Sequence, residues 1–460
     1  MNLSYVANIA EIFAGLAILF SVVKAWPAIT NLNQLVKKDK DWQVQLIAIQ
    51  SGLAKYTGNS CPELPDVETA RDQILTFAIS SGASDIHIEV KQLGDVIQGC
   101  VRFRVDGQLK VVCSYDSELH ADLINAFKIF GSIPTDQSLG PMQGRGRFDL
   151  NDKRIDFRLQ ITPTQTGDYL SARILDPSLA SMPYSALGIG DRDLELIKKT
   201  LDTSEGLLVF GGPTGSGKTV SFYTSINQMD DQALRIISVE DPIEVEIPGI
   251  VQLGVQDRPG HHFDDLMGAV SRSDPDVLLI GEIRSEMTAH YCFRFAVTGH
   301  FVISTIHSNN VIHSLAKLHG YGDVREFPDI TLVNQRLARR LCVKCSTPAT
   351  LLESDVTLID SIVQFNQQDQ INTDGNFRSP VGCEHCINGY KGRVAGYEVL
   401  NVNQVLMDAM ARGRDTSELW SIAISSGTTT VGYNLLQKVS EGETSLAELR
   451  RVAGLDDIPQ

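Results

Sequence analysis

Residues 212–219 read Gly212-Pro213-Thr214-Gly215-Ser216-Gly217-Lys218-Thr219, which matches the consensus of a phosphate-binding loop. An apolar run, 206–210, stands directly before the loop, and a helix-compatible stretch, 220–229, follows it. In this strand–loop–helix setting the glycines let backbone N–H groups turn toward a β-phosphate, and the helix presents its N-terminus to the same group. We expect the Lys218 ammonium to reach the β- and γ-phosphate oxygens, and the Thr219 hydroxyl to bind Mg²⁺. The sequence therefore predicts a site for a nucleoside triphosphate.

Two further apolar runs end in glutamates that suit such a site. A phosphate-binding loop needs an acidic residue at the end of another core strand, where it holds the metal and positions water. The first run, 235–239, is followed by Glu240, and the second, 277–280, is followed one residue later by Glu282. We expect Glu282 and Thr219 to organise the metal. Either glutamate can orient the attacking water, and the sequence does not decide between them.

Two histidines bracket a third apolar run. His300 and His307 flank residues 301–306, which have the composition of a buried strand. Because imidazole changes its charge near neutral pH, histidines placed here can sense the γ-phosphate or orient water. A purely structural role is the alternative. We keep His307 as a catalytic candidate.

Together these segments resemble the secretion ATPases of the type II secretion and type IV pilus assembly family. Besides the phosphate-binding loop, three segments match the acidic box, the Walker B segment and the histidine box of that family, namely 239–244, 274–284 and 298–307. Three more segments match the domain that precedes the ATPase core in the family, namely 83–89, 102–107 and 162–167. The resemblance covers roughly residues 61–454, which is most of the chain.

The resemblance implies a fold, an activity and a set of partners. The implied fold is α/β, with a RecA-like P-loop ATPase core preceded by a small α+β domain. The implied activity is Mg²⁺-dependent ATP hydrolysis by a homo-hexamer that powers type IV pilus or type II secretion pseudopilus assembly with an inner-membrane platform protein. The chain would then lie at the cytoplasmic face of the bacterial inner membrane. A retraction- or conjugation-type secretion ATPase and a nucleotide-gated scaffold that does not hydrolyse ATP are the alternatives.

Three arginines are candidates for contacts with the terminal phosphate. In a ring whose nucleotides lie between subunits or domains, an inserted guanidinium stabilises the charge on the transferred phosphoryl group. By resemblance, Arg158 and Arg173 match phosphate-contacting arginines of the first domain, and Arg272 matches one from the core. The chain departs from the family pattern in three places: Ser285 replaces an acidic residue, Gly268 replaces a frequent arginine, and Ser308-Asn309-Asn310 replaces the more common Thr-Asn-Asp. The first two departures keep the scaffold alternative open.

The chain is acidic, with 40 basic and 56 acidic residues and a formal net charge of −16. Binding to a nucleic-acid backbone needs a basic surface that neutralises phosphates. We therefore expect no nucleic-acid partner, and translocation of DNA is a disfavoured alternative.

Four of the eight cysteines form two Cys-x-x-Cys pairs, Cys342 with Cys345 and Cys383 with Cys386. Four thiolates in this pattern can bind Zn²⁺ tetrahedrally at about 2.3 Å each, and they would pin the intervening segment. A disulfide-bonded pair and unligated thiols are the alternatives, and a reducing cytosol disfavours the disulfide. In the family that the chain resembles, such a tetracysteine insertion is typical of secretion and pilus-extension ATPases and generally absent from retraction ATPases.

The N-terminal segment, residues 1–60, is the least family-like part of the chain. Its apolar stretch, 6–23, precedes a basic cluster, 37–40, and either spans a membrane or docks on a membrane partner or lipid surface. We expect the rest of the chain to form two domains joined by a linker. Residues 61–175 would form an α+β domain that is PAS-like in the family, and 176–188 a proline-containing linker. Residues 189–460 would form a RecA-like ATPase domain with a zinc subdomain at 342–386 and C-terminal helices.

Overall fold

The computed structural model describes residues 66–453, except for 94–95, 137–139, 152, 180–181, 230–231, 327–328, 369–370 and 372–375. The expected membrane or docking segment at 6–23 and the basic cluster at 37–40 lie outside the described residues. The chain divides into two compact units, the first made mostly of residues before 145 and the second mostly of residues from 173 onward. In the part of the chain that is described, every helix is too short or too polar to cross a lipid bilayer.

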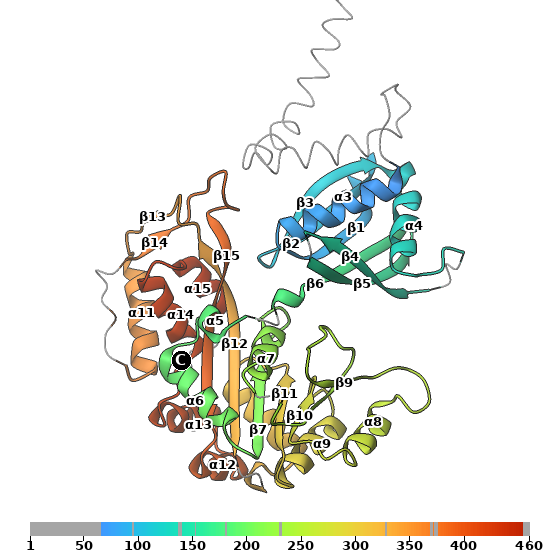
Figure 1. Cartoon of the computed structure of the whole chain (residues 1–460). Helices are drawn as coiled ribbons and strands as arrows, with labels where there is room; N and C mark the ends of the chain where they lie inside the picture. The colour runs from blue at the N-terminus through green and yellow to red at the C-terminus, as the bar shows by residue number, and fades with distance from the viewer. Residues whose placement is uncertain are drawn as a thin grey trace, which may run out of the picture. The chain divides into compact units, whose positions relative to one another are not determined.

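The first unit contains a six-stranded sheet with the strand order β3-β2-β1-β6-β5-β4. Along β5 (Lys153–Thr164) every second residue from 155 to 161 is buried, so one face of this strand is apolar. Helices α3 (Val67–Ser80) and α4 (His120–Phe130) pack against each other and against β1 (Figure 1). The other strands are β1 (Ala83–Leu93), β2 (Val96–Val105), β3 (Gln108–Asp116), β4 (Met142–Leu150) and β6 (Gly167–Leu175).

The second unit contains a seven-stranded sheet with the order β15-β12-β7-β11-β10-β8-β9. Neighbouring strands run parallel, except that β12 and β15 pair antiparallel. Strands β7, β8, β10 and β11 are buried along their whole length, as parallel strands are when helices cover both faces. The strands are β7 (Gly206–Gly211), β8 (Ile236–Glu240), β9 (Val251–Gly254), β10 (Val277–Ile280), β11 (Phe301–Ile306), β12 (Ile330–Leu341) and β15 (Tyr390–Asn401).

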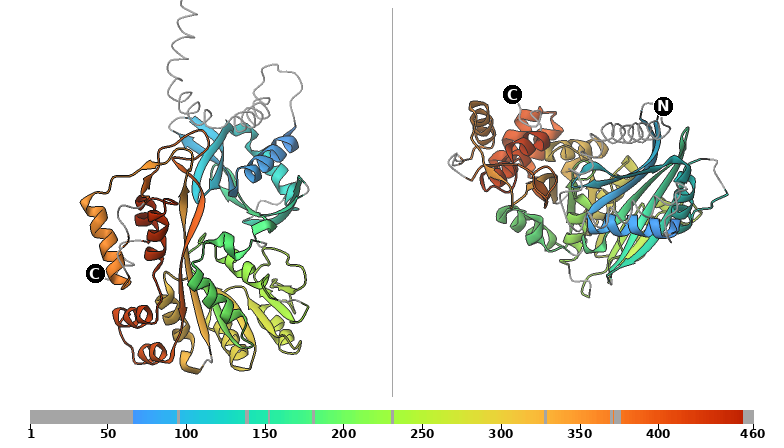
Figure 2. Two further views of the ribbon diagram at one scale, coloured as in Figure 1. Left: turned by 60° about the vertical axis from the view of Figure 1, so that its left-hand side comes forward. Right: turned by 90° about the horizontal axis from the view of Figure 1, so that it is seen from above.

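Helices cover both faces of this second sheet (Figures 1 and 2). One apolar core joins the sheet to α5, α6 and α7, and another joins it to α8, α9, α10, α12 and α13. This arrangement confirms the α/β core predicted from the sequence. The helices are α5 (Tyr184–Leu187), α6 (Asp191–Leu201), α7 (Lys218–Ile226), α8 (Phe263–Val270), α9 (Glu286–Val297), α10 (Val311–Tyr321), α12 (Gln404–Ala411) and α13 (Thr416–Ser425).

Strands β12 and β15 are each 12 residues long and extend their pairing to Leu341 opposite Tyr390. The segment that joins them holds β13 (Thr347–Pro348), α11 (Glu353–Phe365) and β14 (Arg378–Ser379). A third apolar core packs α11, α14 and α15 against this strand pair. The last two helices are α14 (Val431–Ser440) and α15 (Leu446–Ala453).

Candidate active site and tetracysteine cluster

A cavity of about 530 Å³ lies where β7, β8, β10 and β11 end. In open α/β sheets the carboxyl ends of the strands form the edge at which ligands bind. The phosphate-binding loop, both glutamate segments and the histidine segment contribute to its wall, so the structure brings together all the motifs predicted to bind nucleotide. Its polar lining includes Thr214, Lys218, Thr219, Glu240, Asp241, Glu244, Glu282, Arg284 and His307.

The phosphate-binding loop joins β7 to α7. Gly217 has a φ of +89°, a left-handed conformation that glycine adopts at little cost, and the helix begins at the next residue. Lys218 Nζ donates to the carbonyl oxygens of Gly212 at 2.6 Å and Pro213 at 3.0 Å. Burial lowers the pKa of Lys218 to about 8, although the Glu282 carboxylate acts in the opposite direction. A phosphate at Nζ would favour the charged amine, so this position suits an anion.

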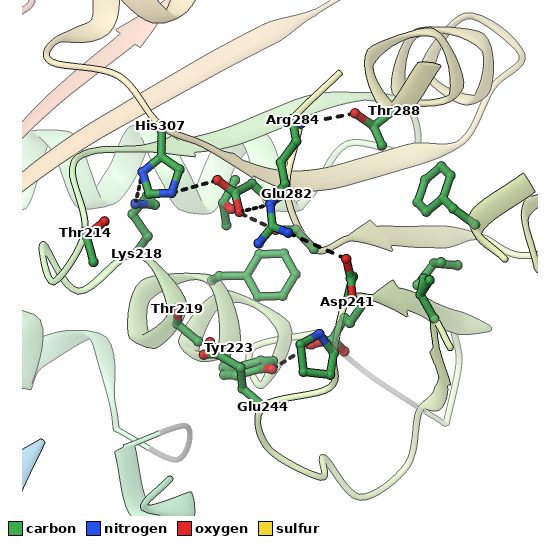
Figure 3. Close-up of a pocket in the computed structure, with 18 of the residues that line it drawn as sticks. Thr214, Lys218, Thr219, Tyr223, Asp241, Glu244, Glu282, Arg284, Thr288 and His307 are labelled. Atoms are coloured by element: carbon green, nitrogen blue, oxygen red, sulfur yellow. Dashed lines mark hydrogen bonds and ion pairs between the residues drawn. The ribbon is translucent and has the colours of Figure 1, made fainter. Parts of the chain in front are cut away.

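His307 lies between Lys218 and Glu282 (Figure 3). Its Nδ1 is 3.4 Å from Lys218 Nζ, and its Nε2 is 2.9 Å from Glu282 Oε1. Because an ammonium group offers only donors, Nδ1 must accept, which assigns the ring proton to Nε2. Glu282 Oε1 is close to Nε2 but is buried and accepts no hydrogen bond in the described structure. Glu282 Oε2 accepts from Arg284 Nε at 2.6 Å, and Arg284 is in turn 3.6 Å from Asp241. Positive and negative groups therefore alternate along this wall of the cavity.

Glu240 differs from Glu282 in its surroundings. It is 5% exposed, and its carboxylate accepts from the Tyr223 hydroxyl at 2.7 Å, from Ser238 Oγ at 2.8 Å and from Gln252 Nε2 at 3.1 Å. Neutral donors satisfy a buried carboxylate without cancelling its charge. Burial and the neighbouring Glu240 raise the pKa of Tyr223, so the phenol keeps its proton and continues to donate. Glu240 is thus fixed in place, whereas Glu282 contacts charged groups of the cavity wall.

The three candidate arginines lie in different places. Arg173, near the end of β6, is among the residues that line the cavity. Arg158 is exposed on β5, and Arg272 is exposed just after α8. Neither Arg158 nor Arg272 lines the cavity. Their expected contacts with a phosphate between subunits or domains stay predictions.

Two of the residues that depart from the family pattern, Ser285 and Asn310, cap helices in this chain. Ser285 caps α9, since its side chain accepts from the Thr288 N–H and the Thr288 side chain accepts from the Ser285 N–H. Asn310 caps α10 by accepting from the His313 N–H at 2.8 Å. Gly268 lies in α8, and a Cβ atom added to it would have open space around it. The two caps fix where helices begin directly after the Walker B and histidine segments.

The four paired cysteines come together as the sequence predicts. Their sulfur atoms all lie within 4.8 Å of one another, and Cys383 Sγ is 3.7 Å from Cys386 Sγ. Sulfurs placed tetrahedrally about 2.3 Å from a zinc ion are about 3.8 Å apart, so this donor set fits that metal. The cluster forms because one pair follows the end of β12 and the other precedes the start of β15, and these two strand ends are paired. Within the described residues, no cysteine forms a disulfide.

Three contributors to the site were missed at the sequence level. Tyr223 follows Thr219 by one helical turn, so both lie on one face of α7. This spacing could have indicated from the sequence that Tyr223 lies at the site. Gln252, on β9, holds Glu240. Gln335, on β12, donates from Nε2 to the Ser216 carbonyl oxygen at 2.7 Å. Both glutamines come from strands whose neighbours the sequence does not specify.

The fold and the cavity define a P-loop protein with an α/β nucleotide-binding core. The chain belongs to the family described as Type II/IV secretion system protein, whose family model matches residues 63–451. This match confirms the predicted resemblance.

Two curated relatives illustrate the family. The chain is similar to type IV pilus assembly ATPase PilB of Acinetobacter baylyi, with 34% identity over 386 residues that cover 83% of this chain and 65% of that protein. It is also similar to type II secretion system protein E of Pectobacterium carotovorum, with 32% identity over 383 residues that cover 82% and 74% of the two chains. The chain thus spans just under two thirds of the length of the first relative.

Solved structures share the fold. The ATPase DotB of Legionella pneumophila aligns with a TM-score of 0.59 and 19% identity, over 85% of this chain and 98% of that chain. The pilus retraction motor PilT with bound ADP aligns with a TM-score of 0.52 and 21% identity, over 85% and 97%. At these identities the likeness concerns the fold alone.

Proposed function

We propose that this chain hydrolyses ATP and serves as a motor for type IV pilus assembly or for type II secretion. The observation that carries the proposal is the convergence of Lys218, Thr219, Glu282 and His307 on one cavity at the carboxyl edge of the sheet. Relatives that are named type IV pilus assembly ATPase and type II secretion system protein support pilus assembly or secretion as the process that the motor drives.

Each of these side chains has a proposed task. Lys218 pairs with phosphate oxygens, and Thr219 and Glu282 would hold Mg²⁺, which when bound neutralises phosphate charge. Glu282 also orients the attacking water, with His307 Nε2 lying 2.9 Å from its Oε1. We favour Glu282 over Glu240 for this task because the Glu240 oxygens already accept three hydrogen bonds from fixed donors.

The quaternary and cellular parts of the proposal rest on the family. We propose a homo-hexamer in which Arg158, Arg173 and Arg272 contact the terminal phosphate across subunit or domain boundaries. An inner-membrane platform protein is the proposed partner, at the cytoplasmic face of the inner membrane, and nucleic acid is not a partner. The domain division at 61–175, 176–188 and 189–460 is part of the same proposal.

The tetracysteine cluster belongs to the proposal as a zinc site. Cys342, Cys345, Cys383 and Cys386 would hold Zn²⁺, which in such a site acts as a structural cross-link. The cluster favours an assembly motor over a retraction motor, because the retraction ATPases of the family that the chain resembles generally lack such a cluster.

The test is ATP hydrolysis by the whole chain as a function of protein concentration, with Lys218→Ala as the blank. Cross-subunit arginines predict that specific activity rises as rings form. Rates equal to the blank over the whole range would contradict a motor and favour the non-hydrolysing scaffold. Rates that depend on added DNA would favour the translocase.

A further inference from the structure

The strands β12 and β15 present two polar pairs beside the nucleotide site. Asn334 lies opposite Glu398, and Gln335 lies opposite Tyr397. Successive residues of a strand point to opposite faces, so one pair points toward each face of the sheet. All four residues are at most 3% exposed. Polar side chains buried this deeply require hydrogen-bond partners. The partners of Asn334, Gln335 and Glu398 lie in the phosphate-binding loop, in the segment that follows His307 and at the start of α14.

Gln335 contacts the phosphate-binding loop directly. Its Nε2 donates to the Ser216 carbonyl oxygen at 2.7 Å. A Cβ atom on Gly217 would lie 2.9 Å from Gln335 Nε2, and one on Gly212 would lie 2.7 Å from the Gln335 carbonyl oxygen. The loop therefore packs against Gln335 at both of its ends, with no room for a side chain at either contact.

The Gln335 side chain makes one hydrogen bond in the described structure, from Nε2 to the Ser216 carbonyl oxygen. Its Oε1 is buried without a hydrogen-bond partner in the described structure, and the same holds for Ser216 Oγ beside it. The amide therefore acts on its surroundings through Nε2 and the Ser216 carbonyl. Because Ser216 is two residues before Lys218, this bond sets the position of the loop segment that delivers the lysine.

Glu398 holds the segment that follows His307. Its Oε2 accepts from the Val311 N–H at 2.9 Å, and its Oε1 accepts from the Val431 N–H at 3.0 Å. These are the first residues of α10 and α14, and a carboxylate at a helix N-terminus is stabilised by the free N–H groups there. Asn334 adds a bond from Nδ2 to Ser308 Oγ at 2.9 Å. The start of α10 is thus fixed four residues after His307.

We propose that Gln335 and Glu398 are positioning residues that hold the phosphate-binding loop and the His307 segment at a set separation. The inference rests on the proposed ATP hydrolysis, in which Lys218 pairs with phosphate oxygens while His307 lies beside both Lys218 and Glu282. One strand pair reaches both segments because the register puts Gln335 and Glu398 one position apart.

The test compares two variants with a control in the whole chain. Gln335→Met removes the donor at similar size, and Glu398→Gln replaces one acceptor oxygen with a donor group. The control is Asn366→Ala, because Asn366 is also buried and accepts from the Thr430 N–H at 2.8 Å but does not line the cavity. Steady-state hydrolysis, binding of a fluorescent ATP analogue and Tm are measured for each.

A misplaced phosphate-binding loop should weaken the binding of ATP equally in the ground state and in the transition state. Gln335→Met should therefore raise KM for ATP about tenfold with kcat little changed. Glu398→Gln should instead lower kcat about tenfold with KM little changed. Asn366→Ala should lower Tm and leave both constants near those of the parent. Parental KM and kcat in both variants, with Tm lowered as in the control, would overturn the inference.

Two further outcomes keep the inference separate from the proposed function. If the parent chain neither binds nor hydrolyses ATP, the proposed function fails. If Gln335→Met does not fold, Gln335→Glu takes its place, since it turns an acceptor toward the Ser216 carbonyl and should raise KM in the same way. A parental KM in a folded Gln335→Glu variant would overturn the role of Gln335.

Discussion

Glu282 Oε1 lies 2.9 Å from His307 Nε2, although the two residues follow different strands. The register of β10 and β11 places Ile280 opposite Ser304, so the chain segments that leave these strands run side by side. The parallel packing of β10 and β11 therefore brings Glu282 and His307 together. The geometry of this pair depends on the sheet rather than on a local motif. Of the two ring nitrogens of His307, Nε2 is the one that lies beside the carboxylate that we propose to orient water.

Replacement of Glu282 should abolish most of the hydrolysis without abolishing binding. We expect Glu282→Gln to lower kcat about 10²–10⁴-fold, the usual effect of losing a general base, while the Kd for ATP changes less than threefold. Glu244→Gln is the control, because Glu244 also lines the cavity but has no described contact with His307. Single-turnover hydrolysis and equilibrium binding decide the matter, and a rate for Glu282→Gln close to that of the control would be incompatible with the assignment.

The sequence predicted those parts of the site that local motifs define. The loop at 212–219, the glutamates and histidine after buried strands, and the two Cys-x-x-Cys pairs each follow from residue type and spacing within a short segment. Gln335 and Glu398 did not follow, because their task depends on β12 lying next to β7 and β15. The order of strands in a parallel sheet results from packing across the whole chain, which periodicity does not show.

The two glutamates illustrate the same limit. Both end a buried strand, and the sequence treats them as equivalent candidates for the base. They differ in their surroundings, since Tyr223 and Gln252 reach Glu240 from α7 and β9, whereas Glu282 contacts Arg284. Contacts of this kind separate residues that a motif cannot distinguish.

The hydrogen bond between Tyr223 and Glu240 should contribute measurably to stability. Tyr223→Phe leaves a buried carboxylate with one donor fewer, and we expect a loss of about 1–3 kcal/mol in the free energy of unfolding. Tyr397→Phe is the matched control, since the Tyr397 hydroxyl is 3.4 Å from Ser221 Oγ and should contribute less. Denaturant unfolding of both variants provides the comparison. Equal losses would show that the contact with Glu240 has no special weight.

ATP binding should take up a proton near pH 8. Burial holds the pKa of Lys218 at about 8 in the folded chain, below its ordinary value of 10.5. The unfolded chain therefore binds more protons between these values, and the cost of burying Lys218 falls as pH rises through them. Bound phosphate favours the charged amine, so affinity should fall as pH rises above about 8. Calorimetry at pH 8.5 in two buffers of different ionisation enthalpy should reveal the uptake. Lys218→Arg should show none, because guanidinium stays charged. Identical heats in both buffers for the parent would rule the effect out.

Removal of zinc should loosen the paired ends of β12 and β15. We expect about one zinc ion per chain in reduced, metal-replete protein, and a structural zinc site contributes on the order of 10 kcal/mol to local folding. Cys383→Ser should lose the metal, lower Tm and expose the segment between the two strands to protease. Cys100→Ser is the control, since Cys100 is buried in the first unit and is not part of the cluster. Metal analysis and limited proteolysis test both variants. Zinc-free parent protein under these conditions would remove the cluster from the proposal and weaken the case for an assembly motor over a retraction motor.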